Sequence, residues 1–178
     1  ELRTEEFPDI KDATANEPGE GEDFVADCVI ESDLELLLPA LYVPQESERI
    51  ALYQELDSIE RPADLKAFEA RLEDRFGRIP DETRELLRVP TLRRLARKLG
   101  IEKVVMKQGS MYTFFVDDTN KAYYQSPMFG RLLNYLQANP GRVEIRERNG
   151  RRSFAIARVA TVSQAVDILQ TVLSLDAI

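Results

Sequence analysis

Two pairs of adjacent carboxylates come closest to a set of residues that could do chemistry. Glu73-Asp74 and Asp117-Asp118 each place two acidic side chains together, and such a pair can act as acid and base or hold a divalent ion. The sequence identifies no third ligand and no apolar setting that would perturb a pKa. We therefore interpret both pairs as solvated groups on a helix face and in a turn. A hydrolase that depends on Asp74 or Asp117 is the third hypothesis in order of preference.

Residues for several other chemistries are absent. The chain has no histidine and one cysteine, Cys28, which excludes a Cys/His zinc site, a Ser-His-Asp triad and a Cys-His pair. The eight glycines are scattered and form no phosphate-binding loop. The sequence therefore predicts no catalytic residue, metal or cofactor in this chain, and it predicts that Cys28 is a small buried side chain.

Basic side chains recur about one helical turn apart between residues 84 and 98, and such a row could follow a phosphate backbone. A helix dipole also favours cations at its C-terminal end. No aromatic residue interrupts the row, so a nucleic-acid-binding accessory domain is the alternative and not the first interpretation. Its predicted contacts are Arg93, Arg94, Arg97 and Lys98.

Five aromatic residues in the second half could form a stacking surface. Alternation within the strands and the general tendency of aromatic side chains to be buried favour packing in the core or at its rim. These residues are Tyr112, Phe114, Tyr123, Tyr124 and Phe129.

Composition and charge place the chain among folded proteins with two electrically different parts. Of 178 residues, 43% are hydrophobic and 31% charged, and no apolar run approaches the roughly 20 residues of a membrane span. Residues 1–60 hold 18 acidic and three basic side chains, whereas residues 61–178 hold 14 acidic and 21 basic ones. Because the chain begins at Glu1 without a secretory signal, we expect a cytoplasmic piece of a longer protein, without membrane contact.

Spacing of apolar residues predicts the elements that must position these groups. Residues 1–22 are acidic and poor in large apolar side chains, which is typical of a linker, and residues 23–178 follow as one domain. A strand is expected from Cys28 to Leu38. Helical spacing then predicts two helices separated near Pro62, a stop at Gly77 and a third helix from Pro80 to Gly100. Pro90 should kink that helix or divide it in two.

After Gly100 the apolar spacing changes to every second residue. It predicts one hairpin around Gly109-Ser110, with Val104, Met106, Tyr112 and Phe114 on its apolar side, and a second around Asn149-Gly150. Two further helices are expected around Leu132 and over the final apolar run. The predicted fold class is α+β, with a helical N-terminal half packed with antiparallel β-hairpins and further helices.

The second predicted helix presents a polar outer face. If Leu65, Phe68, Leu72 and Phe76 point inward, the charged residues Glu69, Arg71, Glu73, Asp74 and Arg75 lie outside. Asp74 is poorly placed for the helix dipole, so a cation should neutralise it. Arg71 or Arg78 of the same chain and an arginine of another domain are equal alternatives.

The run Asp74-Arg75-Phe76-Gly77-Arg78-Ile79-Pro80 resembles the C-terminal domain of the bacterial transcription-repair coupling factors (Mfd). The earlier run Glu31 to Pro39 and the Tyr42-Val43-Pro44 after it strengthen the resemblance. It implies a parent DNA translocase that uses ATP and Mg to displace stalled RNA polymerase from double-stranded DNA and then recruits UvrA. Residues 1–22 would follow its upstream motor domain.

The resemblance also implies a function for this domain. In the family it packs over a UvrB-like UvrA-binding module of the same chain, masks that module and restrains the motor. Two acids on the second helix face arginines of the module; Asp74 matches one, whereas Arg71 stands where the other is expected. The implied interdomain contacts are Asp74, Glu73, Arg71 and Glu69. The first hypothesis is therefore a non-catalytic regulatory domain.

Overall fold

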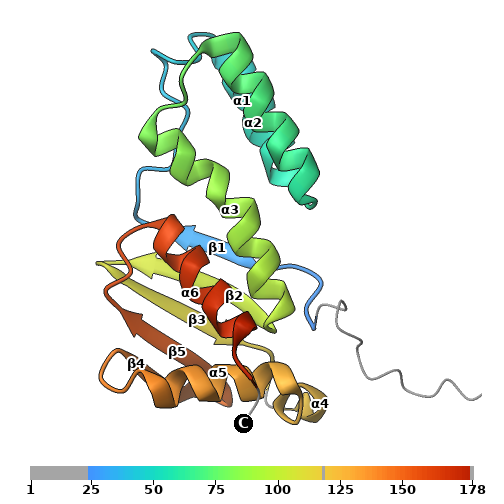
Figure 1. The fold of residues 1–178 in the computed structure, drawn as a ribbon, viewed down its shortest axis with the longest axis vertical. Helices are drawn as coiled ribbons and strands as arrows, with labels where there is room; N and C mark the ends of the chain where they lie inside the picture. Colours follow the sequence, from blue (N-terminus) through green and yellow to red (C-terminus); the bar gives the residue numbers. More distant parts are fainter. Residues whose placement is uncertain (1–23, 118, 177–178) are drawn as a thin grey trace, which may run out of the picture.

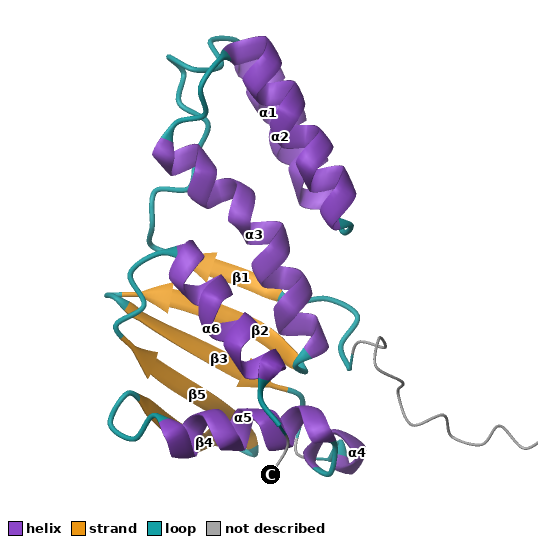
Figure 2. Ribbon diagram, in the orientation of Figure 1, coloured by secondary structure: helices purple, strands orange, loops and turns teal. Residues whose placement is uncertain are grey.

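The computed structural model describes residues 24–117 and 119–176, in which six helices and a five-stranded sheet confirm the α+β class. The sheet has α3, α5 and α6 on one face, and α1 and α2 form a hairpin beyond the end of the sheet (Figures 1 and 2). The predicted linker, residues 1–22, lies outside the described residues. None of the described helices is long and apolar enough to span a membrane.

The strands are joined in the order β1-β2-β3-β5-β4. All neighbouring pairs are antiparallel except β1 and β2, which are parallel because the three helices α1 to α3 connect them. The sheet is therefore mixed: both predicted hairpins are antiparallel, and the first strand, to which the sequence assigned no partner, is parallel to β2. The strands are β1 (Val29–Ser32), β2 (Ile101–Lys107), β3 (Ser110–Phe115), β4 (Val143–Arg148) and β5 (Arg151–Ala157).

The first strand is shorter than its sequence predicts. Its partner β2 ends at Lys107, and the backbone bond from Asp33 N to Met106 O is the last one between them. The chain then turns toward the helices, where Thr83 Oγ1 donates to the carbonyl of Leu37 at 2.8 Å and Leu38 N donates to the Tyr53 hydroxyl at 2.6 Å. The alternation of apolar and polar residues in the sequence continues past Ser32, which is the last residue of β1 to pair with β2.

Both hairpins form, and their turns show why the sequence located one better than the other. Asn149 and Gly150 have φ values of 54° and 73°, as a two-residue turn with both φ positive requires. The first turn is at Gln108 and Gly109, with φ values of 51° and 72°, one residue earlier than predicted. Met111, Thr113 and Phe115 are buried instead of Tyr112 and Phe114, because this two-residue turn pairs Met106 with Met111 and Val104 with Thr113.

The helices begin and end close to the predicted signals. Pro62 is in the first turn of α2, Gly77 follows its last residue with a φ of 86°, and Pro80 precedes α3. Pro90 lies inside α3, which is one continuous helix, so the predicted alternative of two short helices was wrong and that of a kink stays a prediction. The bounds are α1 (Glu46–Ser58), α2 (Pro62–Phe76), α3 (Asp81–Lys98), α4 (Lys121–Tyr124), α5 (Pro127–Ala138) and α6 (Val162–Ser174).

Helix α3 packs in two separate hydrophobic cores, one along each half, and this packing stabilises it as one continuous helix. Its first half places Leu87 in a small core between the helices, and its second half packs on the sheet through Leu92, Leu95 and Leu99. The small core is formed by Leu56, Phe68, Leu72, Ile79 and Leu87, and the large core contains Cys28 and the inner side chains of the sheet. The α1–α2 hairpin is therefore attached to the sheet chiefly through α3.

Candidate functional site on the α1–α2 hairpin

A groove runs between α1 and α2 on their outer side. Its floor is apolar, formed by Leu52 of α1 and by Phe68 and Leu72 of α2, and its volume is roughly 400 Å³. Arg71, Asp74, Arg75 and Phe76 complete its walls. Two of the four residues predicted as interdomain contacts, Arg71 and Asp74, line this groove, whereas Glu69 and Glu73 lie elsewhere on α2.

Two arginines fasten α2 to α1 across the groove. Arg71 donates to Glu55 and Arg75 donates to Glu48, and both glutamates belong to α1. The Arg71 guanidinium also lies 5.6 Å from the Phe68 ring centroid, and that of Arg75 lies 5.0 Å from the Phe76 ring centroid. The positive charges of the groove are therefore matched within the hairpin.

Asp74 is different, since it makes no ion pair or hydrogen bond with any residue that the structure describes. Arg71, one of its two possible local partners, is bound to Glu55, and Arg78 makes no ion pair with it. Glu73 is exposed and Glu69 is half-buried on the same helix, and neither has an ion pair among the described residues. Helix α2 thus carries three carboxylates that make no ion pair with the described residues.

The end of α2 is held by Tyr42, whose structural role the sequence did not reveal. Its hydroxyl donates to the carbonyl of Gly77 at 2.8 Å and lies 3.2 Å from that of Leu72, which satisfies carbonyls that a helix end leaves free. Burial, and next the Glu73 carboxylate, raise the pKa of Tyr42. Nearby, Arg49 Nη1 donates to the Val43 carbonyl at 2.8 Å. Asp74 therefore sits on a firmly anchored helix end.

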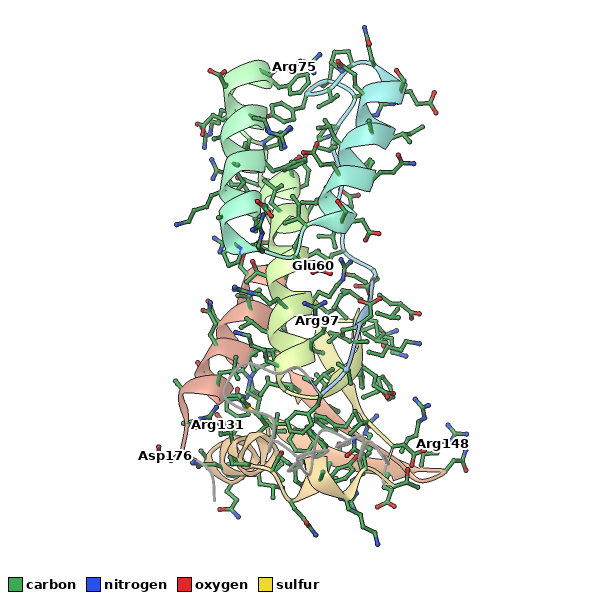
Figure 3. The ribbon with its side chains drawn as sticks, turned by 90° about the vertical axis from the view of Figure 1, so that its right-hand side faces the viewer. Glu60, Arg75, Arg97, Arg131, Arg148 and Asp176 are labelled. Carbon is green, nitrogen blue, oxygen red and sulfur yellow. The ribbon has the colours of Figure 1, made fainter. Side chains whose placement is uncertain are left out.

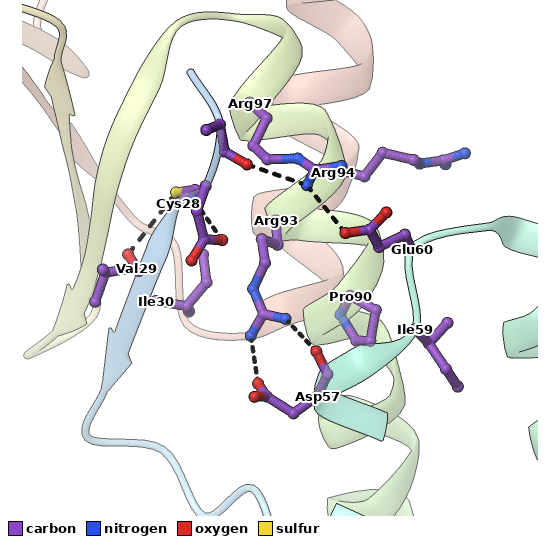
Figure 4. Close-up of a pocket in the computed structure, with 12 residues that line it drawn as sticks. Cys28, Val29, Ile30, Asp57, Ile59, Glu60, Pro90, Arg93, Arg94 and Arg97 are labelled. Atoms are coloured by element: carbon purple, nitrogen blue, oxygen red, sulfur yellow. Dashed lines mark hydrogen bonds and ion pairs between the residues drawn. The ribbon is translucent and has the colours of Figure 1, made fainter. Parts of the chain in front are cut away.

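Three of the four basic residues predicted to contact nucleic acid, Arg93, Arg94 and Arg97, line one pocket, where carboxylates bind two of them. Arg93 binds the side chain and the carbonyl of Asp57 at 3.1 and 3.2 Å, and Arg97 lies 3.7 Å from Glu60 (Figure 4). Arg94 lines the same pocket, which also holds Asp27, and Lys98 is half-buried at the end of α3. Arg93 and Arg97 tie the α1–α2 junction to α3, which disfavours this row as a phosphate-binding track.

The Glu73-Asp74 pair lies far from Asp117, the described member of the second carboxylate pair. Asp74 is on α2 and Asp117 is in the turn after β3, at opposite ends of the molecule (Figure 1). Asp117 Oδ1 accepts a hydrogen bond from Thr119 N at 2.9 Å, as expected of a turn, and Asp118 lies outside the described residues. The described residues contain no group of three or more His, Cys, Asp or Glu side chains that could hold a metal ion.

Cys28 lies at the edge of the Arg93 pocket but is almost fully buried. Burial raises the pKa of its thiol to about 12, so near pH 8 the reactive thiolate is about a thousandfold scarcer than in an unfolded chain. We expect Ellman's reagent to label the native protein about a thousandfold more slowly than the denatured protein. Equal labelling rates would contradict this burial.

The raised pKa of Cys28 also predicts that the folded state is less stable at alkaline pH. Because the thiol ionises more readily in the unfolded chain, its contribution to stability is present below about pH 9 and is lost as the pH rises toward 12. Urea unfolding should show a smaller loss of stability above pH 9 in Cys28→Ala than in the unchanged protein. Identical pH profiles for the two proteins would be the contrary result.

Comparison with known proteins gives concordant results. Residues 32–126 match the TRCF domain family. The chain is 35% identical over 78 residues to the transcription-repair-coupling factor of Escherichia coli strain K12, covering 42% of this chain and 7% of that protein. It is 33% identical over 108 residues to that of Haemophilus influenzae, covering 58% of this chain and 9% of that one. The chain therefore spans less than a tenth of the length of either relative.

The fold has a counterpart among solved structures. A crystal structure of the C-terminal domain of a transcription-repair coupling factor superposes with a TM-score of 0.66 at 15% sequence identity. The match covers 84% of this chain and 94% of that one. At this identity it establishes the fold, and the family match over residues 32–126 adds the lineage.

Proposed function

The chain belongs to the TRCF domain family, as the C-terminal domain of a transcription-repair coupling factor, and from this premise we propose that it is a non-catalytic regulatory domain. Its parent would be an ATP-dependent DNA translocase in the cytoplasm that displaces stalled RNA polymerase from double-stranded DNA and recruits UvrA. ATP and Mg would belong to the parent's motor. The domain would act by packing on the UvrB-like module of the same chain, masking its UvrA-binding surface and restraining the motor.

The observation that best supports this proposal is the available carboxylate of Asp74. Its neighbours Arg71 and Arg75 are bound to glutamates of α1, so no cation within the hairpin neutralises it. A carboxylate near a helix C-terminus is disfavoured by the helix dipole. A cation from outside the domain would neutralise Asp74 and offset the unfavourable interaction with the helix dipole. Both effects are expected of a residue that binds a partner.

Arg71 changes the charge that the family resemblance implies at this point of the contact with the module. Where the family resemblance places an acid, this chain has an arginine that is already paired with Glu55. A module arginine opposite this position would meet a like charge, so the negative charge must come from the flanking positions. Glu69 and Glu73, which lie one helical turn apart, would provide it on another face of α2. We therefore propose Asp74, Glu73 and Glu69 as direct contacts and Arg71 as the side chain that holds α2 in place.

A clamp of this kind needs only a difference in contact free energy between its closed and open states. Couplings of about 1–3 kcal/mol are sufficient to regulate a partner site. Three carboxylates opposite arginines can supply such an amount, because ion pairs near the surface contribute about 0.2–1 kcal/mol each. The interaction would be reversible and would weaken with salt.

Reversing the charge of Asp74 should weaken binding of the chain to the separately expressed UvrA-binding module of its parent. We expect Asp74→Arg to raise the dissociation constant about tenfold, with a smaller effect at high salt. Isothermal titration calorimetry at two salt concentrations measures this.

Asp167→Arg provides the matched control. It makes the same change at an exposed position of α6, on a different part of the molecule, and should bind like the unchanged chain. Equal affinities of both variants for the module would contradict an electrostatic contact at α2.

A further inference from the structure

One face of the sheet is covered by none of the helices that the structure describes. The helices α3, α5 and α6 lie against the other face, and beyond the outer side of the strands there is no further element of the described chain (Figure 2). We call this side the outer face. Figure 3, in which Arg148 marks one end of it, shows that it is well separated from Arg75 and the α1–α2 hairpin.

The strand register fixes which residues form the outer face. Val104, Met106, Met111, Phe115, Phe154 and Ile156 point into the large core, so the residues that alternate with them point outward. These are Lys103, Val105 and Lys107 of β2; Tyr112 and Phe114 of β3; Arg151, Ser153, Ala155 and Ala157 of β5; and Glu144, Arg146 and Arg148 of β4. An aromatic pair thus lies at the centre of the sheet, between two basic strands.

Tyr112 is the centre of this arrangement. Lys107 Nζ lies 5.4 Å from its ring centroid on the β2 side, and the Arg146 guanidinium lies 5.7 Å from it on the β4 side. The ring is half-buried, as is Phe114 two residues along the same strand. Of the five aromatics expected in the core or at its rim, Tyr123 and Phe129 are buried on the opposite side of the sheet and Tyr124 packs against that core, whereas Tyr112 and Phe114 are half-buried on the outer face.

Beside Tyr112 the surface is hollowed. The outward residues of β5 are small, so a groove of roughly 400 Å³ opens above Ala155 and Ala157. Tyr112 and Ser110 form one wall, and Glu144 and Arg146 form the other. The groove therefore has an aromatic ring and a planar guanidinium on facing sides.

The outer face is positively charged in a chain whose net charge is -8. Three of its cations are paired with carboxylates: Lys103 with Glu31 at 3.3 Å, Arg146 with Glu144 at 3.4 Å, and Arg151 with Glu102 at 3.4 Å. Lys107 and Arg148 make no ion pair with the described residues. Five cations against three carboxylates leave an excess that suits an anionic ligand.

We infer that the outer face binds single-stranded nucleic acid. Phosphates would lie along the basic residues of β2 and β4, and bases would stack on Tyr112, on Phe114 and on the Arg146 guanidinium. Stacking on sheet aromatics beside a basic track is the physical basis of sequence-tolerant single-strand binding. An acidic polypeptide would use the cations but would leave the aromatic pair and the groove between flat groups without a role.

The test is fluorescence anisotropy of a labelled oligothymidylate of about 12 nucleotides, titrated with the full 178-residue chain at several salt concentrations. Wild type should bind with an affinity that falls steeply with salt. Lys107→Glu combined with Arg146→Glu should reduce the salt slope by about 1.4, because each lost phosphate contact removes about 0.7. Tyr112→Ala should weaken binding about tenfold with the slope unchanged, since it removes stacking and no charge.

The matched control is Arg84→Glu combined with Arg88→Glu, which makes the same change of charge at two exposed positions of α3 and should bind like wild type. Absence of salt-dependent binding by wild type, or binding lost in this control and kept in the outer-face variants, would overturn the inference. So would equal competition by polyglutamate and by unlabelled oligonucleotide. Circular dichroism of each variant verifies that the sheet is intact.

Discussion

Gly100→Ala should lower the free energy of unfolding by about 2–5 kcal/mol. Gly100 has a φ of 75°, where an alanine costs about 1–2 kcal/mol. An added Cβ would also lie 2.2 Å from Cε2 of the Tyr123 ring, and overpacking of a core costs about 1–3 kcal/mol. Urea unfolding followed by circular dichroism measures the sum as a shift of the midpoint.

Tyr123 cannot move away to accommodate the methyl group. Its side chain is fully buried, its hydroxyl donates to the Leu99 carbonyl at 2.5 Å, and its ring lies 5.1 Å from that of Phe24 and 5.7 Å from that of Phe129. Displacing it would disturb the packing of α3, α4 and α5 together. The clash should therefore remain unrelieved in the native state.

Gly109→Ala is the control that separates the two costs. Gly109 has a φ of 72°, nearly that of Gly100, but an added Cβ would meet nothing within 4 Å. It should lose only the backbone cost of about 1–2 kcal/mol. If both variants were equally destabilised, the Tyr123 ring would have to yield, and the argument from close packing at Gly100 would be wrong.

The sequence located those elements whose limits are set by local chemistry. Proline in the first turn of a helix, glycine after its last residue and Asn-Gly between strands each fix the backbone through their own dihedral angles. Pro62, Gly77 and Asn149-Gly150 therefore gave correct limits. At Gln108-Gly109 the same chemistry was present, but glutamine is an uncommon residue at positive φ, and the turn was placed one residue late.

Features that depend on distant partners could not be predicted in this way. The end of β1 is set by where β2 ends, some 70 residues later, and its parallel pairing depends on how three helices return the chain. The faces of β3 follow from its pairing, in which Val104 lies opposite Thr113 and Met106 opposite Met111. Tyr112 and Phe114, expected in the core or at its rim, therefore alternate onto the outer face, where they form the basis of a binding surface.

The candidate site likewise combines features set by local sequence with features set by contacts between distant residues. Asp74 could be proposed from the sequence because its position relative to Gly77 and the helix end is local. The pairing of Arg71 with Glu55 joins residues 16 apart on two helices, and the Arg93–Asp57 contact joins residues 36 apart. Such contacts decide which charges remain available to a partner, and helical spacing alone does not contain them.

Because the α1–α2 hairpin has a hydrophobic core of its own, it can open locally while the sheet stays folded. The small core has its own buried residues, and α3 and the ties through Arg93 and Arg97 connect it to the rest. If the carboxylates of α2 are part of a clamp, their orientation then depends on a unit of modest stability. Units of this kind open locally at lower free energies than the whole domain.

Phe68→Ala should destabilise this unit selectively, by about 3–5 kcal/mol. The Phe68 side chain is 1% exposed at the centre of the small core, and removing a buried phenyl ring costs about this amount. Native-state hydrogen exchange should show the loss in the amides of α1 and α2, while those of β2, β3 and β5 keep their protection. Phe154→Ala removes the same ring at the same exposure from the large core and should lower protection throughout. An equal loss in helices and strands for Phe68→Ala would mean that the two cores unfold as one, and the hairpin could not then act as a separately responding clamp.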